Sequence, residues 1–544
     1  MGLVSYDIMH TDDLDKHIVS WYTGDTSNKI IMKHFYEKNK YILESEVNKT
    51  FEEILWMSDE EFRQWLRDMR NEIVYAWDHL GLPPRVGFDE QQIIDQFNKM
   101  SSFPVHKFES FNEETQETDV IRNTSVIGNA ANQWFPTMMK TKIVYNDVSK
   151  AKSIYDHFAD EELFDKVYTY GHRHFKRDSF YHYSNPIKQD ATIKIGTISK
   201  KFSSSVEFIE WFETVGRTYD THDYWLKADK ELEYTGYDDK LRNLKFLQLS
   251  REDIEKLNIP DKCKTNMVDN IDVYQIMFFE KGQKIFPVGF KPFRISWCQY
   301  AVNFPPLTAK YLYEKYTEPF KDQDVIKIWD PSSGWGGRIL GAMSVKDDRN
   351  IHYIGTDPNT DHSIEGGTKY EDLANFFNTK TYRGNGLFPH TNTYEIHQVG
   401  SEVFEYEHNS LDMIFTSPPY FAKEAYSDDD TQSYKKFDEY KSWVDGFLKP
   451  TLKNCWNYLK NDRYLLWNIA DAKFGNTMLP LEQDSIDACL ELGFEHKTVL
   501  KMALAQMPGG NRVDEETGKP RAKNFCKVNG IWLKYEPIFV FYKK

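Results

Sequence analysis

Short apolar runs alternate with helix-compatible segments from residue 304 to the last residue of the sequence. Segments 307–316 and 337–343 have the spacing of helices, and each apolar run is too short for a helix but long enough for a strand. Strands that alternate with helices predict an α/β fold with a doubly wound, mostly parallel, Rossmann-like sheet. The runs that we expect to form strands are 325–329, 352–355, 395–399, 411–415, 463–467, 497–504 and 537–542.

The first part of the chain has a different pattern. Apolar residues recur at helical spacing over 58–80 and over 91–100, which predicts a helix-rich region. The polar, acidic stretch 101–124 is the best linker candidate. The pattern therefore predicts three regions: a helix-rich one at 1–115, a mixed α/β one at 116–290, and the doubly wound one at 291–544.

Composition and charge exclude several classes of protein. Hydrophobic residues make up 40% of the chain and charged residues 28%, and no apolar run reaches the roughly 18 residues that a membrane span needs. The five cysteines are odd in number and never occur as C-x-x-C, which argues against disulfides and against a metal site. The first residues have no apolar signal core, and we expect a cytoplasmic protein. The net charge of −16 argues against general binding to phosphates.

The residues best suited to bind and position a substrate lie in the segment Thr416–Tyr420, which follows the strand-like run 411–415. Its sequence is Thr-Ser-Pro-Pro-Tyr, and the two prolines, Pro418 and Pro419, donate no backbone N–H. The carbonyl groups and the Ser417 side chain therefore stay free to accept hydrogen bonds, and Tyr420 offers a ring for stacking. Acceptors beside an aromatic ring suit a substrate with a planar amino group.

A second motif, Asp330–Gly337, joins another predicted strand to a helix with three glycines. Glycines there allow close approach of a ligand to the backbone. The dinucleotide pattern G-x-G-x-x-G is not met, because Ile339 stands at its sixth position. Asp357 ends the next predicted strand, where a carboxylate can accept hydrogen bonds from the two hydroxyls of a ribose. Together these features predict a ribose-bearing cofactor.

The order of the two motifs resembles that of the S-adenosyl-L-methionine-dependent DNA methyltransferases that modify exocyclic amino groups. The resemblance covers residues 300–544 and implies a class I methyltransferase fold, with S-adenosyl-L-methionine as the cofactor. It implies that Asp357 binds the ribose, that Ser401 stands where an acid often contacts the adenine, and that Phe304 lies in a segment packed over the cofactor. The residues that correspond to the first cofactor motif, which holds the methionine part, are Asp330, Ser332, Gly334 and Gly336.

The resemblance also implies roles for the turn and a partner. Ser417 and the carbonyl of Pro418 would hold the amino group of a base flipped out of double-stranded DNA, and Tyr420 would stack on that base. In the family, serine at the first position leans toward N4-cytosine and aspartate toward N6-adenine, so N4-methylcytosine is the expected product. Pro419 completes the motif. No membrane partner is expected.

Several alternatives stay open from the sequence. The product could be N6-methyladenine, the substrate could be an RNA base, or the group transferred could differ from methyl. Related enzymes that methylate a glutamine amide use Asn where this chain has Ser417. An inert nucleic-acid-binding module is a further alternative, although the intact motifs argue against it.

Other segments could contact DNA or cover the site. The stretch 168–177 and the loops 507–512 and 519–523 combine basic residues with aromatic or glycine residues, and each could equally be plain surface. Region 116–290 is a candidate for target recognition. The loop after Tyr420 contains Asp428, Asp429 and Asp430, whose carboxylates should point outward because phosphates would repel them.

Overall fold

A computed structural model of the chain describes rather more than half of its residues. The described residues are 41–42, 44–49, 53, 57–80, 89–122, 127–163, 182–184, 192–195, 198–201, 232–233, 244–247, 251–256, 275–278, 301–345, 349–381, 392–504, 514, 518–520 and 523–544. The candidate DNA contacts in 168–177 and 507–512 lie outside the described residues, as do two residues of the 519–523 loop.

The described residues fall into two compact units. One contains residues of 88–154 and 300–544, and the other contains residues of 37–87 and 155–299. The three regions predicted from the sequence stay a prediction, because a grouping by contacts does not test where independently folding parts end.

The second unit contains the predicted helix of the first region as α4 (Asp59–Leu80). Its buried residues recur every three or four positions, as in Phe62, Trp65, Met69 and Ile73, so one face of the helix is apolar. The other described elements of this unit are β4 (His182–Ser184), β5 (Thr192–Ile195), β6 (Ile198–Lys201), β7 (Leu232–Glu233), β8 (Leu244–Leu247), α9 (Arg251–Lys256) and β9 (Gln275–Phe278), with α6 (Ile154–Ala159) at the boundary.

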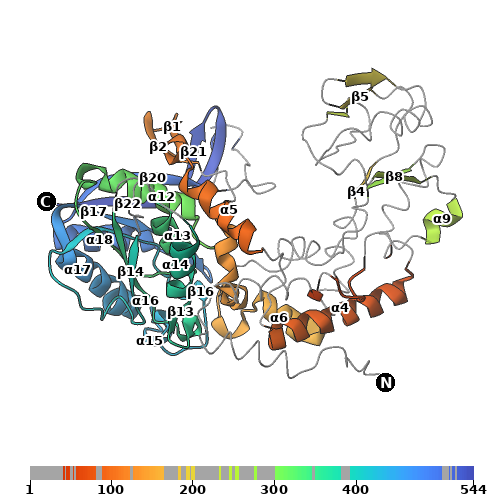
Figure 1. Cartoon of the computed structure of the whole chain (residues 1–544), viewed down its shortest axis with the longest axis horizontal. Helices are drawn as coiled ribbons and strands as arrows, with labels where there is room; N and C mark the ends of the chain where they lie inside the picture. The colour runs from red at the N-terminus through yellow and green to blue at the C-terminus, as the bar shows by residue number, and fades with distance from the viewer. Residues whose placement is uncertain are drawn as a thin grey trace. The chain divides into compact units, whose positions relative to one another are not determined.

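A ten-stranded sheet forms the centre of the first unit (Figure 1). Its order is β1-β2-β20-β22-β17-β15-β10-β11-β14, and β21 pairs with β22. The bounds are β1 Glu109–Asn112, β2 Glu117–Ile121, β10 Ile326–Asp330, β11 Ile351–Thr356, β14 Thr393–His397, β15 Leu411–Thr416, β17 Leu459–Asn468, β20 Glu495–Ala503, β21 Phe525–Val528 and β22 Ile531–Lys543. All seven strands predicted from the apolar runs are confirmed, within a few residues at their ends.

The order of the strands reverses at β10. From β10 the chain proceeds outward through β11 and β14 on one side, and through β15 and β17 on the other, and these five strands are all parallel. β22 runs antiparallel to both of its long neighbours, β17 and β20. The predicted doubly wound, mostly parallel sheet is thus confirmed. In such a sheet the ligand site lies where the carboxyl ends of the strands meet at the reversal.

Helices cover both faces of this sheet, which is why its central strands are apolar on both sides (Figure 1). One face packs against α12 (Pro306–Thr317), α13 (Gly337–Met343) and α14 (Lys369–Lys380), joined by α5 (Glu90–Ser101). The opposite face packs against α16 (Tyr440–Trp443), α17 (Lys449–Tyr458) and α18 (Leu481–Leu492). Along β10 the alternation is direct, since Ile328 faces the first set of helices and Trp329 the second.

The predicted linker at 101–124 is wrong. This stretch contains η1 (Val105–Phe108) and the hairpin β1–β2, and β2 pairs in parallel with β20 to extend the main sheet. The prediction failed because it took polar residues to be exposed, whereas the charged side chain of Asp119 in β2 is paired inside the fold. The carboxylate of Asp119 accepts hydrogen bonds from Asn112 and Thr115 and pairs with Lys501 of β20.

We expect Asp119→Ala to lower the free energy of unfolding by about 3 kcal/mol, because it leaves the mostly buried ammonium of Lys501 without its partner. Chemical denaturation measures the loss, and amide hydrogen exchange should rise first at Val120 and Ile121. Glu495→Ala is the control: its partner Lys497 is 44% exposed, and the cost should stay below about 1 kcal/mol. Equal costs for the two variants would contradict a structural role for the hairpin.

Candidate functional site

The two sequence motifs meet at the reversal of strand order. Asp330 is the last residue of β10 and Thr416 the last residue of β15, and the two strands are hydrogen-bonded neighbours. The Thr416 hydroxyl donates to Oδ1 of Asp330 at 2.8 Å and accepts from the backbone N–H of Ser332 at 3.1 Å. One side chain therefore joins the glycine-rich loop to the Ser-Pro-Pro-Tyr turn.

Asp330 is fully buried and its carboxylate is saturated by the protein itself. Oδ2 accepts from Arg338 Nε at 2.7 Å and from the Tyr353 hydroxyl at 2.6 Å, while Oδ1 accepts from Thr416 and from Ser332 N. Arg338 also donates to the carbonyl of Ser332. A carboxylate with four donors has little capacity left for a ligand. Asp330 therefore shapes the loop around it.

The glycine-rich loop adopts the backbone conformations that its glycines allow. Gly334 and Gly336 have φ values of +63° and +75°, a region that residues with a Cβ avoid. A Cβ on Gly336 would also lie 2.5 Å from the ring of Phe135, whereas one on Gly334 would touch only Arg338 and a carbonyl. The space beside Gly334 is therefore open, whereas the space beside Gly336 is filled by Phe135. Ser332 is half-buried, and within the described residues its hydroxyl has no hydrogen-bond partner.

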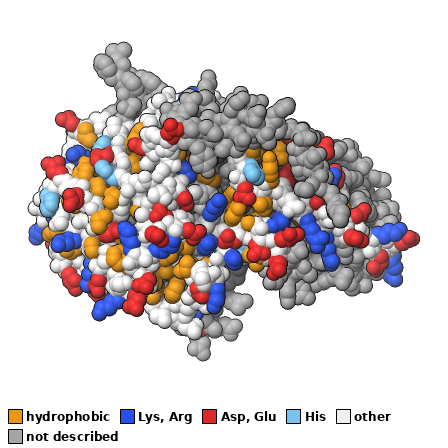
Figure 2. Space-filling model, turned by 90° about the horizontal axis from the view of Figure 1, so that it is seen from below, with side chains coloured by type: hydrophobic (Ala, Val, Ile, Leu, Met, Phe, Trp, Pro, Cys, Tyr) orange, Lys and Arg blue, Asp and Glu red, His pale blue; other side chains and the backbone are white. Residues whose placement is uncertain are grey.

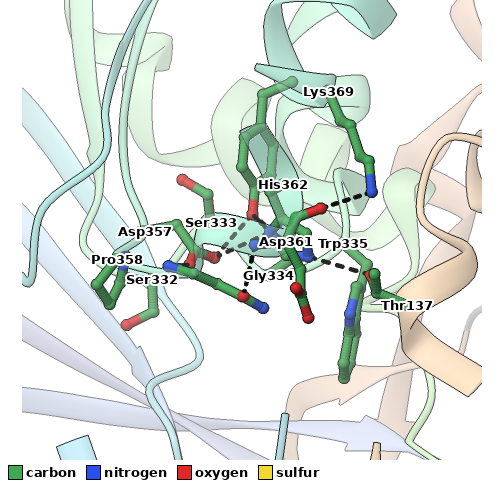
Figure 3. Close-up of polar contacts among 12 residues, drawn as sticks. Thr137, Ser332, Ser333, Gly334, Trp335, Asp357, Pro358, Asp361, His362 and Lys369 are labelled. Carbon is green, nitrogen blue, oxygen red and sulfur yellow. Dashed lines mark hydrogen bonds and ion pairs between the residues drawn. The ribbon is translucent and has the colours of Figure 1, made fainter. Parts of the chain in front are cut away.

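Asp357 lies directly after β11, beside this loop (Figure 3). Its carboxylate accepts from the backbone N–H of Asn359 at 2.8 Å and from the Tyr370 hydroxyl at 2.7 Å, and the backbone of Gly334 adds a further hydrogen bond. Burial raises the pKa of Asp357 to about 6. The side chain is 13% exposed, and a carboxylate offers about four acceptor positions, so vicinal hydroxyls of a ribose fit here.

A buried chain of polar groups holds Asp357 in place (Figure 3). His362 Nδ1 lies 2.8 Å from the Tyr370 hydroxyl, which also donates toward Gly334 O, and His362 Nε2 lies 3.3 Å from the Thr137 hydroxyl. Burial lowers the pKa of His362 well below its usual range, so the ring is neutral near pH 7. A neutral ring with a donor and an acceptor bridges the two hydroxyls without adding charge.

Residues 129–145, from the region predicted as mixed α/β, cover the glycine-rich loop; we call them the covering segment. It comprises η2 (Asn129–Gln133), η3 (Pro136–Lys140), β3 (Lys142–Ile143) and their connections. Asn132 accepts from the amide of Asn303, which also donates to the carbonyl of Trp335 at 2.7 Å. At its other end β3 pairs with β16 (Glu424–Ala425), just after the Ser-Pro-Pro-Tyr turn. The covering segment thus contacts the glycine-rich loop and the strand that follows the turn.

The turn itself is partly enclosed. Pro418 is buried, while Ser417, Pro419 and Tyr420 are half-buried. The Tyr420 hydroxyl donates to Oε1 of Glu536 in β22, and the Ser417 side chain lies close to the same hydroxyl. These contacts fix the ring of Tyr420 beside the serine hydroxyl, in the arrangement that an aromatic platform next to an acceptor requires.

Two other predicted site residues lie in packed surroundings. The Ser401 hydroxyl is buried and lies 3.0 Å from that of Thr451 in α17, so its own oxygen is engaged by the protein. The ring of Phe304 packs edge-on against Phe415 at 5.2 Å and lies 5.8 Å from the guanidinium carbon of Arg338. Phe304 therefore supports the residue that holds Asp330. Contact of either residue with a cofactor stays a prediction.

The acidic loop after the turn behaves partly as expected. The side chains of Asp428 and Asp430 are almost fully exposed. Asp429 instead turns inward and accepts hydrogen bonds from the backbone N–H and the hydroxyl of Thr360, in the loop that follows Asp357. These hydrogen bonds help to hold the pKa of Asp429 near 2 against the opposing effect of burial. One carboxylate of the three thus anchors the loop to the cofactor side.

Among the described residues, no group of three or more His, Cys, Asp or Glu side chains could hold a metal ion. In the same part of the chain, no helix has the length and apolarity to cross a membrane. Cys455, Cys489 and Cys526 are free and buried. Cys263 and Cys298 lie outside the described residues.

Sequence reasoning missed most residues that support the site. Arg338 and Trp335 lie within or next to the first motif and could have been noted, because a buried carboxylate needs a partner. The others come from distant parts of the chain, where no local pattern marks them. They are Asn132, Phe135, Thr137, Tyr353, His362, Tyr370, Glu424, Tyr426 and Glu536.

Parts of the chain are similar to known proteins. No curated protein matches the chain. Solved structures that match include a TehB-like SAM-dependent methyltransferase from Corynebacterium glutamicum (14% identity, 44% of this chain, 89% of that chain, TM-score 0.23). Another is a SAM-dependent methyltransferase from Methanosarcina mazei (12% identity, 41% of this chain, 94% of that chain, TM-score 0.23).

A third structure, from Thermus thermophilus, is provisionally named a DNA modification methylase and is complexed with S-adenosyl-L-methionine. It is 22% identical over 27% of this chain and 54% of that chain, with a TM-score of 0.18. Residues 411–544, which include the Thr416–Tyr420 turn, match the N6/N4 methyltransferase family model, described as DNA methylase. The resemblance seen in the sequence is therefore confirmed by the family match of residues 411–544.

Proposed function

We propose that this protein is an S-adenosyl-L-methionine-dependent DNA methyltransferase that modifies an exocyclic amino group, with N4 of cytosine favoured. The observation that carries the proposal is the pair of hydrogen bonds of Thr416, which hold a ribose-compatible cofactor loop against a Ser-Pro-Pro-Tyr turn. Methyl transfer needs its two reactants side by side, and this contact brings their sites together.

The cofactor would lie along the carboxyl ends of β10 and β11. The carboxylate of Asp357 would accept the ribose hydroxyls, and the open side of Gly334 would allow the chain of the ligand to pass close to the backbone. The free hydroxyl of Ser332 would face its polar end. When bound, S-adenosyl-L-methionine supplies a methyl group on a positively charged sulfur.

The turn would prepare the nitrogen for attack. An exocyclic amine of a base is a poor nucleophile, because its lone pair is delocalised into the ring. Hydrogen bonds from its two N–H groups to the Ser417 oxygen and the Pro418 carbonyl would draw it toward tetrahedral geometry and stabilise the charge that develops. Tyr420 would stack on the flipped base, and its ring is already fixed by Glu536.

The choice of base and of partner rests on the residues of the turn. Ser417 favours cytosine N4 over adenine N6 by resemblance, and double-stranded DNA is the expected partner. A chain with a net charge of −16 must concentrate its phosphate contacts, because non-specific affinity comes from Lys and Arg. RNA, or another planar amine, would be revealed by the same experiment as DNA.

The first experiment incubates the full chain with methyl-labelled S-adenosyl-L-methionine and, in parallel reactions, with amplified, unmethylated DNA and with transcribed RNA of mixed sequence. Digestion to nucleosides and mass spectrometry should find the label on N4 of cytosine. Ser417→Ala should lower the rate by about 10²-fold, because one of the two acceptors is lost. Label found only on N6 of adenine would correct the choice of base. Label on RNA alone, or on neither nucleic acid, would reject a DNA methyltransferase.

We expect cofactor affinity to depend on the protonation of Asp357. The ionised carboxylate accepts ribose hydrogen bonds, so affinity should fall as the pH drops through about 6, where the carboxyl gains its proton. Asp357→Asn should weaken binding by about 10-fold or more and remove this pH dependence. Calorimetric titration between pH 5 and pH 8 measures both effects.

A matched control for this titration is Glu72→Gln in α4, which belongs to the other compact unit. Burial also raises the pKa of Glu72, and its carboxylate accepts from the Ser45 hydroxyl. The variant keeps an acceptor for that hydroxyl, and its binding curve should follow that of the wild type. If Asp357→Asn also followed it, Asp357 would have no part in binding the ribose.

We expect Thr416→Val to weaken cofactor binding and methyl transfer together, because it disconnects the turn from Asp330 and Ser332. The loss of stability should be about 1–3 kcal/mol, the cost of unpaired buried polar groups. Thr317→Val is the control, since it removes a buried hydroxyl that donates to the carbonyl of Tyr313 and accepts from Arg349, before the amino end of β11. That control should lose stability and keep its cofactor affinity; the same affinity loss in both variants would contradict the coupling.

A further inference from the structure

Two carboxyl groups beside the turn have no part in the function proposed so far. Glu536 in β22 accepts from the Tyr420 hydroxyl, and Glu424 in β16 accepts from the Tyr426 hydroxyl at 2.6 Å. Burial raises the pKa of both carboxyls. Carboxyl groups with raised pKa values at a substrate site are suited to exchange protons near neutral pH.

The backbone fixes Glu536 at the site. β22 runs antiparallel to β17, with Ile538 opposite Asn468, so Glu536 projects beyond the carboxyl end of β17. The amide of the buried Asn468 donates to the carbonyl of Pro537 at 2.9 Å, which fastens this part of β22 to the end of β17. Glu536 therefore lies at the edge of the sheet where Asp330 and Thr416 also end their strands.

The hydrogen bonds among these side chains have a defined direction. An ionised carboxylate can only accept, so the Tyr420 hydroxyl must donate to Glu536. The Ser417 hydroxyl lies close to the Tyr420 oxygen and can turn to donate to it. When Ser417 donates its hydrogen to Tyr420, its own lone pairs remain free. This is the orientation in which Ser417 can accept an N–H from an amine.

We propose that Glu536 receives, through Tyr420 and Ser417, the proton that the methylated amine must lose. The inference rests on the proposed methyl transfer. The nitrogen forms its bond to the methyl carbon as the carbon–sulfur bond breaks, and it then carries one hydrogen too many. That hydrogen moves to the Ser417 oxygen, the Ser417 hydrogen moves to the Tyr420 oxygen, and the Tyr420 hydrogen moves to Glu536. The products are the neutral methylated base and a protonated Glu536.

The surroundings of Glu536 suit a group that takes up one proton and returns it to solvent. Tyr420 and Lys534 favour its ionised form, whereas burial opposes that form. The charge of Glu424 lies close enough for the two carboxyls to repel each other, and Lys423 offsets part of the charge of Glu424. Tyr420 itself stays protonated at neutral pH, because burial and Glu536 raise its pKa well above the usual value.

The test compares Glu536→Gln with the wild type in single-turnover methyl transfer to amplified DNA of mixed sequence. We expect the rate to fall by about 10²-fold, with the affinity for S-adenosyl-L-methionine unchanged. With S-adenosyl-L-methionine kept saturating at every pH, the wild-type rate should fall at low pH as Glu536 gains its proton, and the variant should lack this acid limb. Asp462→Asn is the matched control, because it alters another tyrosine–carboxylate pair, Tyr542 with Asp462 at 2.7 Å, near the amino end of β17 and therefore at the opposite edge of the sheet. Its rate and pH profile should stay as in the wild type.

A second measurement needs neither cofactor nor DNA. In protein labelled with ¹³C at the Cζ atoms of tyrosine, Tyr420→Phe identifies the Tyr420 signal. This signal should move with pH as Glu536 titrates, and the movement should vanish in Glu536→Gln. Tyr420→Phe and Glu536→Gln should also slow methyl transfer by a similar factor, and the double variant should be no slower than either single one, because both break the same route.

The outcomes separate the two proposals. If the wild type transfers no methyl group to DNA, the proposed function fails, while the Tyr420 signal still tests the pairing. If the wild type is active and Glu536→Gln, folded and binding cofactor normally, keeps its rate and its acid limb, the proton route is wrong. Additive losses in the double variant would also reject it, since they would mean that Tyr420 and Glu536 act independently.

Discussion

The buried carboxylate of Asp330 is the interaction on which the site depends. It accepts from residues of four separate elements: the glycine-rich loop, α13, β11 and β15. A fully buried charge is stable only when it is paired and hydrogen-bonded, and Arg338 provides the opposite charge just after the same motif. Removal of any of these donors would leave an uncompensated polar group in the core. The energetic cost of such a group strongly favours the single arrangement observed.

This arrangement explains why residues far apart in the sequence work together. Thr416 lies on a strand that neighbours β10 only because the sheet reverses its order there, and the reversal opens the edge at which a ligand can enter. Side chains on the face of the molecule seen in Figure 2 are of mixed type, with acidic and basic groups interspersed. In this view the described side chains form no surface of one charge. The covering segment contacts the glycine-rich loop and the strand β16 that follows the turn.

The sequence predicted the parts of the fold whose signals are local. Strands buried on both faces read as apolar runs, and the positions of Asp330, Asp357 and Ser417 at strand ends followed from those runs. The hairpin β1–β2 was missed because its polar residues are satisfied by Lys501, which lies far away in the sequence. Phe135, Tyr370 and Glu536 were missed for the same reason: a contact between distant residues leaves no pattern in either segment. Aromatic and acidic residues are also too common in this chain for any one of them to stand out.

Tyrosine–carboxylate pairs recur around the site, and the choice of tyrosine has a physical reason. Tyr353 bonds Asp330, Tyr370 bonds Asp357, Tyr426 bonds Glu424 and Tyr420 bonds Glu536. A lysine or arginine in these places would lower the pKa of each carboxyl and fix it in the ionised form. A phenol instead fixes the orientation of the carboxyl without adding charge, and because burial raises the pKa of each of these tyrosines, the phenol remains a donor at neutral pH. Among these four carboxyls, Asp330 carries an arginine as well, and its carboxylate is the one saturated by the protein. Asp357 and Glu536, which have a tyrosine partner and no arginine partner among the described residues, are the carboxyls proposed to bind the ribose and to take up the proton.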